Sequence, residues 1–248
     1  MVKKISVIVP KSWQELTDRQ LYYIYNLFAD NLSAGQIKTF CLIKWGKMKV
    51  VCKYGDGYML QQGKNKFVVT AELLADAIHA LDWIDELPQS PVRISSIGRA
   101  KAVDAAFMGV PFEKFLFCDN LYQGYLETQN HALLAQMAEV LYDKEGINLN
   151  QAEKIAIFYW WAALKSLFAR SFPTFLQPMP VDMHNLLDDN NIGKKLQEAM
   201  NAQIRALTKG DITKEKEVLS MDCWRALTEL EAQAKEYEEF NRKYGNNK

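Results

Sequence analysis

The stretch Ile155–Phe175, IAIFYWWAALKSLFARSFPTF, is the most apolar part of this 248-residue chain and decides how the fold is interpreted. Its uninterrupted apolar run ends at Leu164, whereas a helix that crosses a bilayer needs about 20 such residues. In a helix of this sequence every face is apolar, so every face must be buried. The stretch therefore predicts the central helix of a helical bundle, with Trp160 and Trp161 in the core.

Signals for the ends of this helix flank the stretch. Asn150 followed by Glu153 has the spacing of a capping box, in which each side chain accepts from the other residue's backbone N–H. Pro173 stops a helix soon after Arg170. We expect a helix from Gln151 to Arg170.

Upstream, the pattern predicts a short strand at 5–9 and then two helices. Ser12 and Glu15 have capping-box spacing before a helix at 15–29, and a second helix covers 33–45. After residue 45 the spacing of the apolar residues changes from the helical period to the alternation of apolar and polar residues typical of strands. Segments 47–54, 58–61 and 67–69 are separated by glycine-containing turns, which predicts a small antiparallel meander.

The remainder of the chain has the pattern of helices. Thr70 is a candidate cap for a helix at 71–81, and further helices are expected at 111–128, 130–142, 192–207 and 214–244. The fold class is therefore mainly α with a small antiparallel β meander (α+β). We predict an N-terminal α+β unit at 1–86, a linker or exposed loop at 87–110, and a helical domain at 111–248.

The formal net charge is zero, but the charge is unevenly distributed. Lys and Arg outnumber Asp and Glu by 11 to 4 in residues 1–69, whereas acids prevail by 13 to 6 in residues 70–160. A neutral total provides no global field that would attract nucleic acid or an anionic membrane. The segregation indicates either that the basic unit packs beside the acidic one or that each meets its own partner.

The residues contain no recognisable catalytic or metal-binding motif. Cys41, Cys52, Cys118 and Cys223 are scattered, which is typical of free thiols in a reducing compartment, and 1–13 lacks a signal-peptide cleavage site. We expect a cytoplasmic protein without a cofactor.

Two clusters of polar residues could each be a functional site or an ordinary structural feature. Asp182 and His184 could orient an imidazole or form a loop pair, and Asp82, Asp85 and Glu86 could bind a cation or form an exposed helix end.

A first candidate interaction surface is the set of lysines in and beside the meander. It comprises Lys44, Lys47, Lys49, Lys53, Lys64 and Lys66, interleaved with Trp45, Tyr54, Tyr58 and Phe67. Such a mixture suits single-stranded nucleic acid, an acidic protein surface, or strand edges kept from aggregating by solvated lysine. Because the set contains no arginine, specific base recognition is disfavoured, and nucleic acid is the less expected partner.

A second candidate surface is a narrow stripe along the last helix. Its members recur at spacings of four and three, as in a coiled coil: Cys223, Leu227, Leu230, Ala234, Tyr237, Asn241 and Tyr244. The helix either docks on its own domain or forms a seam with a partner or a second copy. We take Leu227, Leu230, Tyr237 and Tyr244 as the contact residues.

Three segments carry a resemblance to a group of known proteins. Pro10–Leu16 (PKSWQEL), Lys44–Lys47 (KWGK) and Val110–Glu113 (VPFE) make the chain resemble proteins of bacteriophage and prophage virion-assembly modules, of the tail-assembly-chaperone or tail and connector type. The resemblance implies a non-enzymatic helical protein that binds other virion components in the bacterial cytoplasm, either staying there or entering the virion. The resemblance assigns no functional role to any residue of this chain. The alternatives are a nucleic-acid-binding accessory protein using 44–69, or an enzyme with an unrecognised site.

Overall fold

The computed structural model describes residues 7–30, 32–176 and 192–244. It is mainly helical with a small antiparallel sheet, so the predicted fold class is confirmed. The chain divides into two compact units. One contains residues 1–88 together with 150–156, and the other contains residues 89–149 and 157–248.

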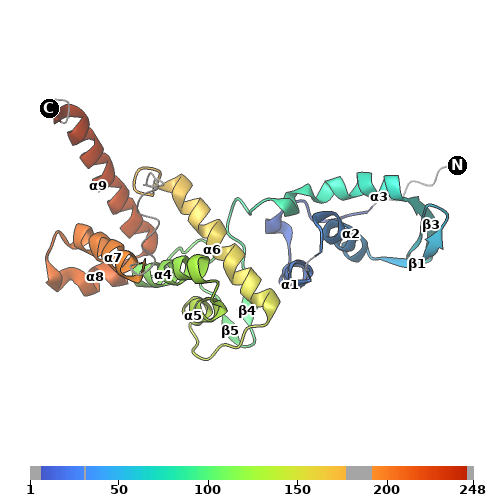
Figure 1. The fold of residues 1–248 in the computed structure, drawn as a ribbon, viewed down its shortest axis with the longest axis horizontal. Helices are drawn as coiled ribbons and strands as arrows, with labels where there is room; N and C mark the ends of the chain where they lie inside the picture. Colours follow the sequence, from blue (N-terminus) through green and yellow to red (C-terminus); the bar gives the residue numbers. More distant parts are fainter. Residues whose placement is uncertain (1–6, 31, 177–191, 245–248) are drawn as a thin grey trace. The chain divides into compact units, whose positions relative to one another are not determined.

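The N-terminal unit combines short helices with the sheet (Figure 1). Its elements are η1 (Trp13–Glu15), α1 (Asp18–Ala29), α2 (Ala34–Trp45), β1 (Met48–Tyr54), β2 (Gly57–Gln62), β3 (Asn65–Thr70), α3 (Ala71–Ile78) and η2 (His79–Asp85). The strand predicted at 5–9 does not form where the structure describes it: Val7–Val9 have no regular structure, and Ile8 is 88% exposed.

The first helix begins at Asp18, later than the spacing of Ser12 and Glu15 predicts. The Ser12 side chain makes no capping bond, and only the 3-10 turn η1 follows it before extended backbone at Leu16. The reciprocal capping box forms instead between Thr17 and Gln20. Buried Trp13 explains the delay, since its indole donates to the carbonyls of Trp83 and Glu86 (3.1 and 3.0 Å) and anchors η1 separately.

The sheet is the predicted meander, with strand order β1-β2-β3 and antiparallel pairing. The β1–β2 turn needs a left-handed residue, which Gly55 supplies at φ 59°. A bulge between Val50 and Cys52 shifts the register of β1. Only Gly57 and Leu60, both on the central strand, are buried, so most of the sheet stays accessible.

The C-terminal unit is helical apart from a two-residue hairpin, and Figure 1 shows its helices from green to red. Its elements are β4 (Ser96–Ile97), β5 (Ala100–Lys101), α4 (Phe112–Thr128), α5 (His131–Leu141), α6 (Gln151–Ser171), α7 (Ile192–Thr208), η4 (Ile212–Lys214), α8 (Glu215–Ser220) and α9 (Cys223–Tyr244). The residues of α6 up to Ala156 belong to the N-terminal unit, and the rest of the helix to this one.

Helix α6 is the predicted central helix. Its capping box forms as expected, with Asn150 and Glu153 exchanging bonds of 2.8 and 2.9 Å. Trp160 and Trp161 are fully buried. Lys165, which interrupts the apolar run, pairs with Asp119 of α4 at 2.8 Å, so its charge is compensated. Among the described residues, no helix combines the length and apolarity needed to cross a membrane.

Segment 87–110 is neither a linker nor wholly exposed. Its residues 89–110 belong to the C-terminal unit, and Ile94, Phe107 and Val110 are buried there. Tyr142 donates to the Ile94 carbonyl at 2.7 Å, and the backbone N–H of Val103 donates to Leu141 at 2.8 Å. The Pro and Gly residues that suggested a linker instead let the chain turn while these side chains fill the core.

The helix predicted at 214–244 is interrupted at Met221 and Asp222. The Met221 carbonyl accepts from the Phe112 N–H, and the Cys223 N–H donates to Val110, both at 2.8 Å. Asp222 accepts from the Gly109 N–H at 2.7 Å and from the Arg225 N–H at 3.0 Å. Long-range backbone pairing therefore ends α8, and the Asp222 carboxylate caps α9.

Candidate functional site

The six predicted lysines are all exposed, but the sheet separates them. Lys49 and Lys66 both pair with Gln61 of β2 and so lie on one face, whereas Lys53 pairs with Tyr58 and lies on the other. Lys64 occupies the β2–β3 turn. The side chain of Lys44 lies over the Tyr23 ring at 5.6 Å.

We call the face that contains Lys49 and Lys66 the open sheet face. By the same register it also contains Cys52, Tyr54, Met59, Gln61 and Val68. Lysine and apolar side chains therefore alternate on an accessible surface. Of the expected aromatic residues, Trp45 stacks on Trp83 with ring centroids 6.3 Å apart, so it is not a free stacking platform.

The predicted stripe on α9 divides into two parts. Cys223, Leu227 and Leu230 are buried in the C-terminal unit, as expected for docking on the helix's own domain. Beyond Ala234 the stripe is uncovered, and Tyr237, Phe240 and Tyr244 are 68%, 60% and 65% exposed. Figure 1 shows this half of α9 extending past α7 and α8.

We call these three residues the α9 aromatic stripe. Phe240 was not predicted, although its spacing of three from Tyr237 and four from Tyr244 was visible in the sequence. The rings of Phe240 and Tyr244 lie 4.9 Å apart, so they form one continuous apolar surface.

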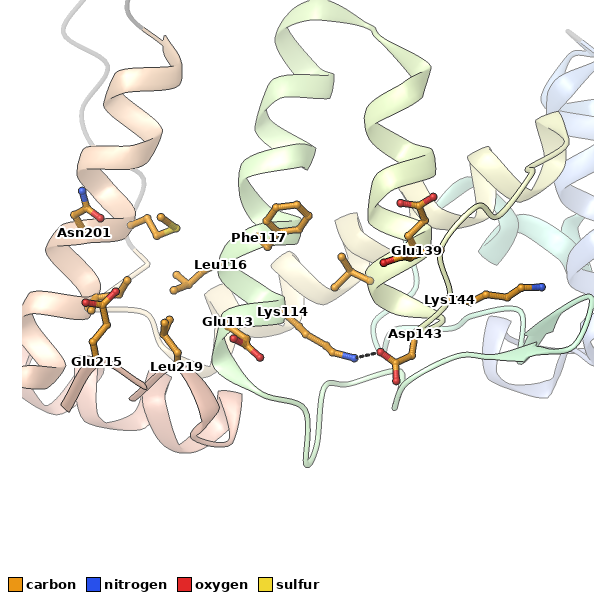
Figure 2. A pocket seen from close by; sticks show the side chains of 14 residues that line it. Glu113, Lys114, Leu116, Phe117, Glu139, Asp143, Lys144, Asn201, Glu215 and Leu219 are labelled. Atoms are coloured by element: carbon orange, nitrogen blue, oxygen red, sulfur yellow. Dashed lines mark hydrogen bonds and ion pairs between the residues drawn. The ribbon is translucent and has the colours of Figure 1, made fainter. Parts of the chain in front are cut away.

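A groove of about 720 Å³ opens between α4, the end of α5, α7 and α8 (Figure 2). Its apolar lining comes from four separate helices: Leu116, Phe117, Val140, Met200, Ile204 and Leu219. Figure 2 shows Phe117 pointing from α4 toward α5, and this ring is 50% exposed. A half-exposed phenylalanine inside a concave surface is typical of a binding site.

The rim of this groove is acidic. It carries five carboxylates, Glu113, Glu139, Asp143, Glu145 and Glu215, and two lysines, Lys114 and Lys144. Lys114 pairs with Asp143 at 3.0 Å, and Glu139 accepts from the Gly146 N–H at 2.8 Å. Within the described part of the chain, Glu113, Glu145 and Glu215 have neither an ion pair nor a side-chain hydrogen bond. We call this site the acidic groove.

The sequence did not predict the acidic groove, because its residues come from segments about a hundred positions apart. The excess of acids in 70–160 was the only signal. Over the ranges that the structure describes, no group of three or more His, Cys, Asp or Glu residues could hold a metal ion. Asp82 and Asp85, considered for a cation, instead bind Lys38 at 2.6 and 2.7 Å.

Two expectations remain, one for the Asp182 and His184 pair and one for the four cysteines. Asp182 and His184 lie outside the described residues. The four cysteines are free, and only Cys52 is exposed. Burial raises the pKa of the Cys41 thiol to about 12, which makes it a poor nucleophile at neutral pH.

Comparisons with known proteins give no relative: no family model, no curated protein and no solved structure matches this chain.

Proposed function

We propose that this protein is a non-enzymatic protein–protein interaction factor that binds its partner through the α9 aromatic stripe. One observation carries the proposal. The same helix is buried at Leu227 and Leu230 and becomes exposed while its apolar spacing continues through Tyr237 and Tyr244. Residues at i, i+3 and i+7 on an exposed helix are the anchors of helix-in-groove and coiled-coil recognition.

The chemistry of the stripe suits a protein partner. Each large aromatic side chain can bury about 150–250 Å² on binding and keeps few rotamers, so the entropy lost is small. Charged residues flank the rings, with acids such as Glu236, Glu238 and Glu239 and the bases Arg242 and Lys243. A rim of both signs favours one register of a partner helix over others.

We further propose that the protein acts in virion assembly. The resemblance of Pro10–Leu16, Lys44–Lys47 and Val110–Glu113 to phage and prophage tail-module proteins supports this role. The partner would be another tail or connector protein, met in the cytoplasm of the bacterial host.

The test is co-expression of the chain with the products of neighbouring genes, followed by affinity capture and measurement of the dissociation constant. Replacing Tyr237, Phe240 and Tyr244 together by serine should weaken capture at least about tenfold, as expected for hot-spot anchors. The control replaces Leu73, Met108 and Leu126, which are exposed elsewhere, by serine. Equal affinity of the two variants would reject α9 as the binding surface, and capture of no neighbouring product would reject the assembly role.

A further inference from the structure

Two surfaces of this chain have complementary properties. The acidic groove has an apolar floor and a rim with three more carboxylates than lysines. The open sheet face carries Lys49 and Lys66 beside the exposed apolar side chains of Tyr54 and Val68. Each surface therefore combines apolar area with charge, and the two charges are of opposite sign.

The groove restricts what can occupy it. The carboxylates of Glu113, Glu145 and Glu215 repel an anionic ligand, so a stable occupant must bring positive charge. Leu116 and Phe117 also require apolar groups, because a hydrated cation alone would leave their side chains facing water. Figure 2 shows Glu113 and Glu215 on elements that border the same opening. The occupant is therefore both basic and apolar.

The open sheet face meets these requirements in a rigid form. In the described part of the chain, neither Lys49 nor Lys66 has an ion-pair partner, so both charges are available. Val68 lies on the same face as Lys66, two residues along β3, and is 44% exposed. The sheet holds the backbone of these residues at fixed spacing, so docking orders their side chains without having to order the backbone.

We propose that the acidic groove of one copy binds the open sheet face of a second copy. Because the two surfaces differ, the contact is head to tail, and each copy keeps one free groove and one free sheet face. Such a contact extends into a chain of copies or closes into a ring. The inference goes beyond the proposed function, since it uses neither the α9 aromatic stripe nor a foreign partner.

The first experiment measures the mass of the full chain by sedimentation velocity over a range of protein and salt concentrations. We expect oligomers whose dissociation constant rises as salt is added, because salt screens the opposite charges. A monomer at every protein concentration in low salt would overturn the inference. Binding of the groove to a basic segment of some other protein without self-association would overturn it too.

Charge reversal locates the contact. Glu113→Lys with Glu215→Lys reverses the groove, and Lys49→Glu with Lys66→Glu reverses the sheet face. Each variant alone should self-associate at least about tenfold more weakly, because like charges then face one another. Mixing the two variants should restore association, which also shows that both fold. Failure of the mixture to associate would contradict the assignment of the two surfaces.

The matched control makes the same change of net charge as the groove reversal, but outside both surfaces. Asp76→Lys with Glu127→Lys alters two exposed residues outside the groove and the sheet face, and it should associate like the wild type. The serine variant of the α9 aromatic stripe should also associate like the wild type. Self-association that is lost in the stripe variant and kept in both charge reversals would overturn this inference and leave the proposed function standing.

Cross-linking tests the contact directly. Cys52 lies on the open sheet face and is the only exposed cysteine, so a second thiol can be placed in the groove. A chain with Cys52→Ser and Glu215→Cys is mixed with wild type and treated with a short bis-maleimide. We expect a cross-linked peptide joining positions 52 and 215. An equal yield with Cys52→Ser and Glu127→Cys would show that the links form by random collision and would overturn the proposed contact.

Discussion

Trp160 on α6 and Trp224 on α9 donate hydrogen bonds to consecutive backbone carbonyls, those of Ala105 and Ala106, at 2.8 and 2.7 Å. Two helices far apart in the chain therefore hold the same turn. The next residue, Phe107, is fully buried at φ 64° and packs edge-on against Trp161 with centroids 5.4 Å apart. These contacts tie segment 87–110 to the helical core and position the start of α4, which borders the acidic groove.

The first prediction concerns the indole of Trp224. Trp224→Phe removes the hydrogen bond to Ala106 and should lower the free energy of unfolding of the C-terminal unit by about 1–2 kcal/mol. Urea unfolding followed by circular dichroism measures the change. The control is Trp83→Phe, measured by the unfolding of the N-terminal unit that contains it, since the buried Nε1 of Trp83 has no hydrogen-bond partner in the described structure. An equal loss in both variants would mean that ring area, not the hydrogen bond, matters.

The second prediction concerns the buried Lys38. Lys38→Met leaves Asp82 and Asp85 without their shared counter-ion and should lower the thermal midpoint of the N-terminal unit by roughly several degrees. Calorimetry measures the shift, and Lys44→Met, which changes an exposed lysine, should leave the midpoint nearly unchanged. Equal midpoints for the two variants would show that the ion pairs at 2.6 and 2.7 Å contribute no stability.

The third prediction is the pH dependence of the same cluster. The hydrogen bond from Lys38, followed by that from His79, lowers the pKa of Asp82, while the carboxylates of Asp82 and Asp85 raise the pKa of Lys38. The contribution of Asp82 is therefore present above its unfolded value of about 3.9 and is lost as the pH falls through its folded pKa. The contribution of Lys38 is present below about 10.4 and is lost as the pH rises through its folded pKa.

Urea midpoints measured across pH should therefore decline less steeply at both extremes in Lys38→Met than in the wild type. Parallel pH profiles for the two proteins would contradict the assigned coupling.

The fourth prediction concerns Glu231, a buried carboxylate on α9. It accepts from the backbone N–H groups of Thr174 and Phe175 at 3.0 and 2.8 Å and pairs with Lys235 at 3.1 Å. Burial alone would raise the pKa of Glu231, but these bonds together lower it. Glu231→Gln should cost about 1–3 kcal/mol in unfolding free energy and speed amide hydrogen exchange at 174–175. Glu229→Gln, on the exposed side of the helix, should change neither.

The fifth prediction is selective thiol chemistry. N-ethylmaleimide at neutral pH should modify Cys52 within minutes and leave Cys41, Cys118 and Cys223 unmodified until the protein unfolds, because burial raises the pKa of these three thiols. Intact mass spectrometry counts the adducts. A second adduct on the folded protein would show that one of the buried sites opens.

Features encoded within a few residues were predictable from the sequence. The capping box at Asn150–Glu153 and the glycine turn at Gly55 formed where their spacing indicated. The capping box expected from Ser12 did not form, although its spacing was equally good, because Trp13 finds its partners some seventy residues away. A local signal therefore holds only where no distant contact competes with it.

The sequence by itself determined that α6 is a buried helix, since residues apolar on every face have no stable position facing water. It also determined the meander, whose turns depend on neighbouring residues alone. Only the tertiary structure decided that α9 begins at Cys223, that half of its stripe is uncovered, and that carboxylates from α4, α5 and α8 share one groove. The reason is physical: these features depend on which distant segments pack together, and neither hydrophobic period nor capping chemistry records that pairing.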